Sequence, residues 1–292
     1  MLKFFFSKKI NQKKINKYPT NNEYAYEYVA KPKVSFIFNH FVALNTLLMS
    51  IKNLKKMKIT NEIIVINDKG INTDKIFSSL KKNNDTVITT YNLMEVNGYI
   101  LGSKISRATD FLVFIQDDDL APNNNLWLTD VLRYFKRDKS LGLIGINGGG
   151  IKSYKKELLD FSKKNLNKNF FYCSWVKSGP LIFKKKVFDK IGGWEKLANI
   201  GEADHFSDKL ISHKVWLNGY KTGLLINKNT LQWKRRFNRD DNLTKKDLKK
   251  LKNRNITWHL NRKKFLKKFK KSLLMVEKKA IDANLKIAIN YK

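Results

Sequence analysis

The chain has 292 residues but only one cysteine, only four prolines and no long run of apolar residues. The single cysteine, Cys173, excludes a disulfide within the chain and a cluster of thiolate metal ligands, so a reducing compartment is expected. Cys173 stands among aromatic residues, and we interpret it as a small core side chain. No apolar run approaches the roughly 20 residues that cross a bilayer as a helix.

Acidic residues are also scarce, with 25 Asp and Glu against 59 Lys and Arg, which gives a formal net charge of +34. Only eight of the basic residues are arginine. Surfaces that read bases or clamp phosphates favour the planar arginine fork, so the lysine excess indicates a general bias of composition. We therefore expect no specific nucleic acid, whereas a chain this basic should still bind an acidic membrane surface. The expected location is cytoplasmic, either free or peripheral on the cytoplasmic face of the membrane.

Hydrophobic residues make up 42% of the chain and aromatic residues 12%, which is enough for a sizeable core and argues against disorder throughout. Residues 1–30 lack hydrophobic periodicity and are rich in Lys, Asn and Tyr, which predicts a basic N-terminal tail. The alternative for Phe4, Phe5 and Phe6 is a weak interfacial membrane anchor. Their apolar patch is shorter than the core of a signal peptide, which needs about seven residues or more.

After this tail, apolar strands alternate with helices along the chain. Strands are predicted at 34–38, 62–68, 86–90, 111–116 and 141–147, and helices at 43–59, 73–84, 100–108 and 125–138. Thr73 or Asp74 is the expected cap of the second helix. Because the strands are apolar throughout, we predict an α/β fold with a mostly parallel sheet flanked by helices. The second half adds a bend and a strand within 170–183, short helices at 185–194 and 207–220, and a strand at 221–226.

Polar residues follow the predicted strands, and three of them are the adjacent aspartates 117–119. Ligands of such sheets bind beyond the carboxyl ends of the strands, so these positions mark the candidate site. Three neighbouring carboxylates repel one another unless a cation joins them, and oxygen ligands of this kind suit Mg²⁺ or Mn²⁺. Such an ion would hold a diphosphate and take up charge as the diphosphate leaves. The alternative is a solvated acidic turn that caps the following helix.

Five segments in this order resemble the family 2 glycosyltransferases of the GT-A fold. "VSFIFNH" is similar to the family's opening strand, and "EIIVINDKGINTD" is similar to its second strand and acidic turn. "TDFLVFIQDDDLAP" resembles the metal-binding strand end. "GPLIFKKKVFDKIGGWEK" resembles the acceptor-side segment, and "VWLNGYKTGL" the late helix. The resemblance covers roughly residues 33–230. It implies a GT-A (Rossmann-like) domain, a nucleotide-sugar donor and a Mn²⁺ or Mg²⁺ cofactor.

The resemblance implies roles for several residues on the nucleotide side of the site. Asn39 and His40 fall where the family touches the donor nucleotide. Asp68 matches the second residue of an acidic pair that meets the uracil, but the first residue of that pair is Asn67 here. The Ala-Arg-Asn motif that usually precedes the metal strand is missing, and Lys104 or Arg107 is the candidate that would supply its positive charge to the donor.

The metal and the sugar have their own candidates. Asp117 and Asp119 match the two ends of the metal-binding Asp-x-Asp, with Asp119 as the direct ligand. Asp117 and Asp118 are also expected beside the donor nucleotide. Gly179 and Pro180 match the turn that lies beside the sugar.

Sugar transfer with inversion also needs a carboxylate that removes the proton of the acceptor hydroxyl. The family supplies it from a Glu-Asp pair ahead of a helix that ends in Gly-Tyr. Counting back from Gly219–Tyr220 puts Asp208 at that aspartate, so Asp208 ranks first as the catalytic base, Glu202 second and Asp204 third. Trp175 is a candidate for stacking on a sugar face, and core packing is its alternative role.

Together these features predict a basic tail at 1–30, a GT-A domain at 31–232 and a basic helical C-terminal extension at 233–292. The expected function is metal-dependent transfer of a sugar from a nucleotide-diphosphate sugar, UDP-linked in the first instance, with inversion. The acceptor would be a hydroxyl of a glycan, lipid or protein. On charge alone, the basic helices over about 244–280 would bind the acceptor or an acidic membrane surface.

Two other classes of protein stay open at this point. A sugar nucleotidyltransferase uses a similar sheet but wants a glycine-rich loop after the first strand, and "FNHFVALNT" has no glycine. A non-catalytic basic protein that binds sugar, membrane or nucleic acid on a degenerate transferase fold is the second class. The missing arginine motif and Asn67 keep it open. Such a protein would keep its function after replacement of Asp117 and Asp119.

Overall fold

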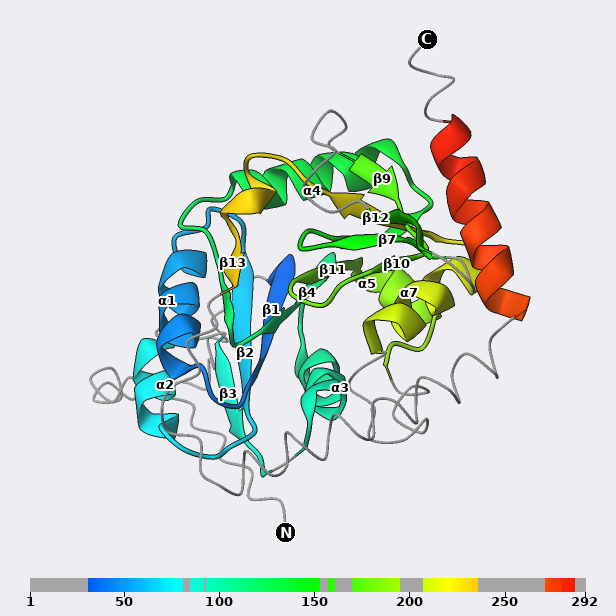
Figure 1. Ribbon diagram of the computed structural model, residues 1–292. Coiled ribbons are helices and arrows are strands. Elements are labelled where there is room, and N and C mark those ends of the chain that lie inside the picture. Colours follow the sequence, from blue (N-terminus) through cyan, green and yellow to red (C-terminus); the bar gives the residue numbers. More distant parts are fainter. Residues whose placement is uncertain are drawn as a thin grey trace, which may run out of the picture.

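The computed structural model describes residues 31–80, 85–91, 93–152, 157–160, 170–194, 207–235 and 271–286. Its central sheet consists of eight strands: β1 (Val34–His40), β2 (Asn61–Asn67), β3 (Thr86–Thr89), β4 (Phe111–Gln116), β6 (Leu141–Gly145), β9 (Phe170–Tyr172), β11 (Leu181–Lys184) and β12 (Lys221–Leu225). Their order across the sheet is β3-β2-β1-β4-β11-β6-β12-β9 (Figure 1). No helix within the described ranges is long and apolar enough to cross a membrane.

The sheet is mostly parallel, as the sequence predicts. Strands β3, β2, β1 and β4 run in one direction, and the register places His40 beside Asn67 and Asn39 beside Gln116. The polar residues at these strand ends therefore meet at one edge, which we call the strand-end edge. Strands β11 and β9 run the other way, β11 between β4 and β6 and β9 beside β12. The apolar pattern of these two strands carried no information on their direction.

The helices are α1 (Leu44–Leu54), α2 (Thr73–Ser79), α3 (Glu95–Ile105), α4 (Leu126–Arg137), α5 (Lys185–Lys190), α7 (Ser207–Leu217), the 3-10 turn η3 (Thr230–Gln232) and a helix over residues 271–286. Helix α3 begins five residues before the predicted helix at 100–108, and α1 ends five residues before the predicted end at 59. The cap of α2 is Asn72, with a left-handed φ of 56°, rather than Thr73 or Asp74.

Helices cover both faces of the sheet. Neighbouring side chains of a strand point to opposite faces, so apolar strands have apolar side chains to bury on each face. On one face, Phe36 of β1 contacts Trp127 of α4, with ring centroids 6.4 Å apart. On the other face, α3 lies so close to β1 that a Cβ placed on Gly102 would come within 2.4 Å of Ile37 Cγ2. Glycine at this position therefore allows α3 to pack directly on β1.

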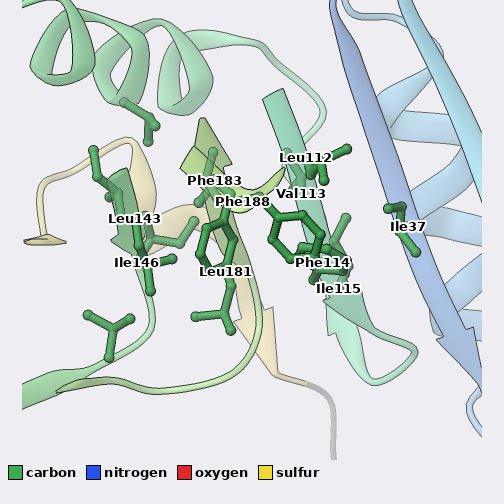
Figure 2. Packing of buried hydrophobic residues seen from close by; sticks show 14 of the residues in the cluster. Ile37, Leu112, Val113, Phe114, Ile115, Leu143, Ile146, Leu181, Phe183 and Phe188 are labelled. Atoms are coloured by element: carbon green, nitrogen blue, oxygen red, sulfur yellow. The ribbon is translucent and has the colours of Figure 1, made fainter. Parts of the chain in front are cut away.

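Aromatic side chains from β4, β11 and neighbouring helices form a core at the centre of the sheet (Figure 2). The ring of Phe114 lies 5.3 Å from Phe188, 5.9 Å from Phe183 and 5.1 Å from Tyr99 of α3, measured between centroids. Leu181, the first residue of β11, pairs with Phe114 near the end of β4. The antiparallel direction of β11 therefore delivers the residues just before it, including Gly179, to the strand-end edge.

Two small sheets accompany the central one: β7 (Gly149–Lys152) pairs with β8 (Glu157–Asp160) and β10 (Trp175–Val176), while β5 (Asp119–Leu120) pairs with β13 (Lys234–Arg235). In the second pair, Asp119 lies opposite Arg235 in the register. Residues from the predicted C-terminal extension thus form a strand beside one of the three aspartates.

The helix over residues 271–286 packs against the outer edge of the sheet at β9 (Figure 1). Its Val276 and Ala280 are fully buried. The side chain of Asn284 pairs with the backbone of Tyr172 in β9, as a neighbouring strand would. Tyr172 N donates to Asn284 Oδ1 at 2.9 Å, and Asn284 Nδ2 donates to Tyr172 O at 2.8 Å. This part of the predicted C-terminal extension therefore closes the exposed edge of the sheet.

We expect Asn284→Ala to detach this helix from β9. The change removes both hydrogen bonds to the backbone of Tyr172, at about 1–3 kcal/mol for polar groups left without partners. The free energy of unfolding in urea should fall by about that amount, and amides of 271–286 should exchange faster than those of β1. Asn218→Ala, which removes an exposed bond within one helix end, is the control and should change little. Unaltered exchange in 271–286 would contradict the role of Asn284.

Candidate functional site

Asp117 holds the loop between β1 and α1. Its Oδ2 accepts hydrogen bonds from the backbone N–H groups of Phe41 and Val42 at 2.8 Å and of Ala43 at 2.9 Å, and it lies 3.0 Å from His40 Nδ1. Burial by itself would raise the pKa of Asp117, but the hydrogen bonds from His40, Ala43 and Phe41 hold that pKa below its usual value. Asp117 is therefore an ionised anchor of this loop, with one carboxylate oxygen already in use.

Asp68 performs the same task for the loop between β3 and α3. Its Oδ1 accepts from Thr90 Oγ1 at 2.9 Å and from Leu93 N, and its Oδ2 accepts from Met94 N at 2.9 Å. Met94, the N-cap residue of α3, has a positive φ of 70° and makes no side-chain capping hydrogen bond. The carboxylate of Asp68 thus caps α3 from a distance, which explains why this helix begins at Glu95.

A small pocket lies between the β1–α1 loop and the β2–α2 loop. Asn67 fixes the second loop, since its Nδ2 donates to Ile71 O and to Thr73 Oγ1, both at 2.9 Å. Lys69 Nζ lies 5.9 Å from the centroid of the Phe41 ring across the pocket. The pocket is shallow, with a cavity volume of about 30 Å³, and is lined by His40, Phe41, Val42, Leu44, Lys69, Ile71 and Asn72.

Asp119 lies against the turn that precedes β11. The residue is 3% exposed, its Oδ2 accepts from Gln116 N at 3.3 Å, and its backbone carbonyl accepts from Ser50 Oγ at 2.9 Å. A Cβ placed on Gly179 would come within 2.0 Å of Asp119 Oδ2, and Gly179 has a φ of +83°. Glycine is therefore required here both for the backbone conformation and for the approach of the carboxylate.

Asp208, in the first turn of α7, contacts the residue before Gly179 in the same turn. Its Oδ2 accepts a long hydrogen bond of 3.4 Å from Ser178 N, and its Oδ1 accepts from Lys209 N at 2.7 Å. Burial raises the pKa of Asp208, while the charges of Lys209 and Lys177 oppose that shift. Because Ser178 contacts Asp208 and the next residue contacts Asp119, the structure brings the predicted base and the predicted metal ligand to one short turn.

Other predicted sugar-side residues lie around this turn. Pro180 is buried and leads into β11. Trp175 of β10 is partly exposed, and Lys209 Nζ lies 4.6 Å from the centroid of its ring. The indole Nε1 of Trp175 is buried without a hydrogen-bond partner in the described structure. Trp175 thus lies next to the residue that follows Asp208.

Three predicted donor residues have different surroundings. Asn39 is 8% exposed and packs against α3, because a Cβ placed on Gly98 would come within 2.1 Å of Asn39 Oδ1. Lys104 is exposed in the last turn of α3, near the amino-terminal ends of the strands, where Arg107 pairs with Glu62 at 3.1 Å. The structure therefore does not bring Lys104 to the strand-end edge. Asp118 is partly exposed in the turn between β4 and β5.

Glu202 and Asp204, the second and third candidates for the base, lie outside the described residues. Lys69 in the pocket and Ser178 in the turn were not predicted from the sequence. Lys69 follows the predicted site residue Asp68, and Ser178 precedes the predicted site residue Gly179, so only their proximity in the chain could have indicated them.

The aspartates allow a test of whether the site suits a divalent metal. Among the described residues, no three His, Cys, Asp or Glu side chains form a group that could hold a metal ion by themselves. Mg²⁺ in sites that act on nucleotides usually takes one or two carboxylates and completes its shell with water and substrate phosphates. Asp119, with Asp118 beside it, fits that smaller set, because Asp119 Oδ2 accepts a long bond from Gln116 N whereas Asp117 Oδ2 accepts three short backbone bonds.

Two solved glycosyltransferases are similar to this structure. The mannosyltransferase PcManGT from Pyrobaculum calidifontis, in complex with GDP-Man and Mn²⁺, matches 68% of this chain and 57% of its own at 14% identity and a TM-score of 0.48. GalNAc-T7 with UDP, GalNAc and Mn²⁺ matches 68% of this chain and 45% of its own at 14% identity and a TM-score of 0.51. The chain thus spans about half the length of the solved structures that it matches. No protein-family model and no curated protein sequence matches it.

The likeness to GalNAc-T7 concerns the fold, because the identity is low. It agrees with the eight-stranded, mostly parallel sheet and with helices on both of its faces. The chain therefore has a GT-A-like glycosyltransferase fold.

Proposed function

We propose that the chain is a metal-dependent glycosyltransferase that moves a sugar from a nucleotide-diphosphate sugar to an acceptor hydroxyl. The observation that carries this proposal is that Asp119 and Asp208 lie against successive residues of one turn, Gly179 and Ser178. One carboxylate faces the end of β4, and the other begins α7. Two such carboxylates suit a reaction in which one binds a metal ion beside the leaving diphosphate and the other removes the proton of the acceptor hydroxyl.

The donor nucleotide would occupy the pocket between the β1–α1 and β2–α2 loops. Asp117 and Asp68 would support it indirectly, by holding the loops, rather than through contacts of the engaged oxygens. Asp119 and Asp118 would hold Mn²⁺ or Mg²⁺ together with the diphosphate, and the bound ion would stabilise the charge of the leaving group. UDP-sugars are the first donors to test, since UDP and Mn²⁺ are named for GalNAc-T7.

The proton of the acceptor hydroxyl would pass to Asp208. Burial raises its pKa, which makes its carboxylate a stronger base than an exposed aspartate. Attack on the face opposite the leaving diphosphate gives transfer with inversion. Trp175, next to Lys209, would offer an aromatic surface to a glycan, lipid or protein acceptor.

A donor-hydrolysis screen tests this function. The purified chain is incubated with UDP-, GDP- and CMP-sugars and Mn²⁺ or Mg²⁺, and the released nucleotide is measured. We expect slow, metal-dependent release from one donor, and a loss of about a hundredfold or more in Asp119→Asn because the charge that binds the metal is removed. Asp110→Asn, an exposed aspartate before β4, is the matched control and should retain release.

The opposite result is also informative. If no donor is hydrolysed and none raises the melting temperature of the chain, the proposal fails. The remaining class is then a non-catalytic binding protein on a transferase fold, in which the three aspartates act only in folding.

A further inference from the structure

We propose that the outer face of the helix over residues 271–286 binds the surface of an anionic lipid bilayer. This inference is independent of the proposed transfer reaction. It concerns a surface at the far edge of the sheet, beside β9, rather than the strand-end edge (Figure 1). The residues of this face are Leu274, Met275 and Leu285, together with Lys271, Lys278, Lys279 and Lys286.

The inner face of the helix determines which residues point outward. Val276 and Ala280 are fully buried, and Asn284 is fixed to the backbone of Tyr172 by two hydrogen bonds. These contacts prevent rotation of the helix about its axis. Side chains spaced by four and eleven residues share one stripe of a helix, so Leu274, Lys278 and Leu285 line up on the opposite side.

Three large apolar side chains of this helix are exposed. Leu274 is 49% exposed, Met275 43% and Leu285 57%. Elsewhere in the described structure, large exposed apolar side chains occur singly on different elements, such as Leu126 on α4 and Leu217 on α7. Here three of them lie on one helix of sixteen residues, Leu274 and Met275 in its first two turns and Leu285 near its end, with lysines near each of them.

The charges around this group indicate its partner. Four lysines surround it, and Asp282 is the one acidic residue on the exposed side of this helix. Leucine and methionine between lysines is the pattern of a helix that lies in a membrane interface, with apolar side chains among the acyl chains and ammonium groups at the phosphates. A nucleic acid would use the lysines but not the leucines. The formal charge of +34 adds a long-range attraction to an anionic surface.

Vesicle sedimentation with the full chain tests this proposal. Vesicles of phosphatidylcholine alone are compared with vesicles that also contain phosphatidylglycerol, at physiological salt. The chain should bind the anionic vesicles, and both Leu274→Ser with Leu285→Ser and Lys278→Gln with Lys279→Gln should weaken binding about tenfold or more. Leu126→Ser with Leu217→Ser and Lys52→Gln with Lys56→Gln are matched controls at exposed positions of other helices and, for Lys56, of the turn after α1, and they should bind as the unmodified chain does.

All substituted side chains are exposed, so folding should persist, and circular dichroism checks it. Equal binding by every variant would assign the lipid affinity to the overall charge and overturn the proposal. Loss in the lysine variant without loss in the leucine variant would also overturn it, because it would show charge pairing without insertion. Donor hydrolysis is not measured here, so failure of this surface leaves the proposed reaction untouched.

Discussion

Replacing Asp117 with alanine should lower the free energy of unfolding by about 3 kcal/mol and abolish nucleotide binding. The change leaves the backbone N–H groups of Phe41, Val42 and Ala43 without their common acceptor, and each such loss costs about 1–3 kcal/mol when water cannot replace it. The β1–α1 loop forms one wall of the candidate nucleotide pocket, so the wall should lose its conformation. Urea denaturation and titration with UDP measure the two effects.

The pH dependence of stability separates this role from a purely metal-binding one. The pKa of Asp117 is lowered from 3.8 in the folded chain, so its contribution to stability is present above about pH 3.8 and is lost as the pH falls below that. Asp117→Ala should lack this acid-dependent part. Asp110→Ala, at the opposite end of β4, is the control and should change stability little. A stable Asp117→Ala chain that loses only metal-dependent binding would contradict the anchoring role.

The outline of the fold could be predicted from the sequence because it depends on local patterns. Apolar strands that alternate with amphipathic helices are sufficient to predict a mostly parallel sheet, and the strand over 111–116 was placed to the residue. The direction of β11 was not predictable in this way. It is set by pairing with Phe111–Phe114 of β4 on one side and with β6 on the other, and a buried strand is apolar in either direction.

The start of α3, which was predicted five residues too late, depends on a hydrogen-bond acceptor far away in the chain. Helix α3 starts at Glu95 because Asp68 accepts from Leu93 and Met94, more than twenty residues away. The docking of residues 271–286 depends on Asn284, a residue that composition alone places in a polar, basic extension. Local propensity contains no information on either contact.

The candidate site was predictable in position and only partly in detail. Polar residues at strand ends meet at one edge of a parallel sheet by geometry, so Asp68 and Asp117 were correctly placed there. A carboxylate at a strand end can face a ligand or fasten a neighbouring loop, however, and the residue type is the same in both cases. The hydrogen bonds of Asp68 and Asp117 show that loops use these two carboxylates. Their roles toward a donor stay predictions.

Replacing Asp208 with asparagine should lower turnover about a thousandfold while nucleotide binding is retained. A general base contributes roughly a hundredfold to ten-thousandfold to rate, and an amide cannot take up the proton. Asparagine keeps the size of the side chain and an oxygen that accepts from Ser178 N, so the turn beside Asp119 should persist. Initial rates of nucleotide release at saturating donor, together with the dissociation constant of UDP, separate the two quantities.

The pH profile provides the sharper test of Asp208. Because burial raises its pKa against the opposing charges of Lys209 and Lys177, the rate of the unmodified chain should fall on the acid side with an apparent pKa above 3.8. Asp208→Asn should lose that acid limb. Asp189→Asn, an exposed partner of Lys185, should keep both the limb and the rate. Full activity in Asp208→Asn would move the role of base to Glu202 or Asp204, and the carboxylate of Asp208 would then serve only to hold the Ser178–Gly179 turn.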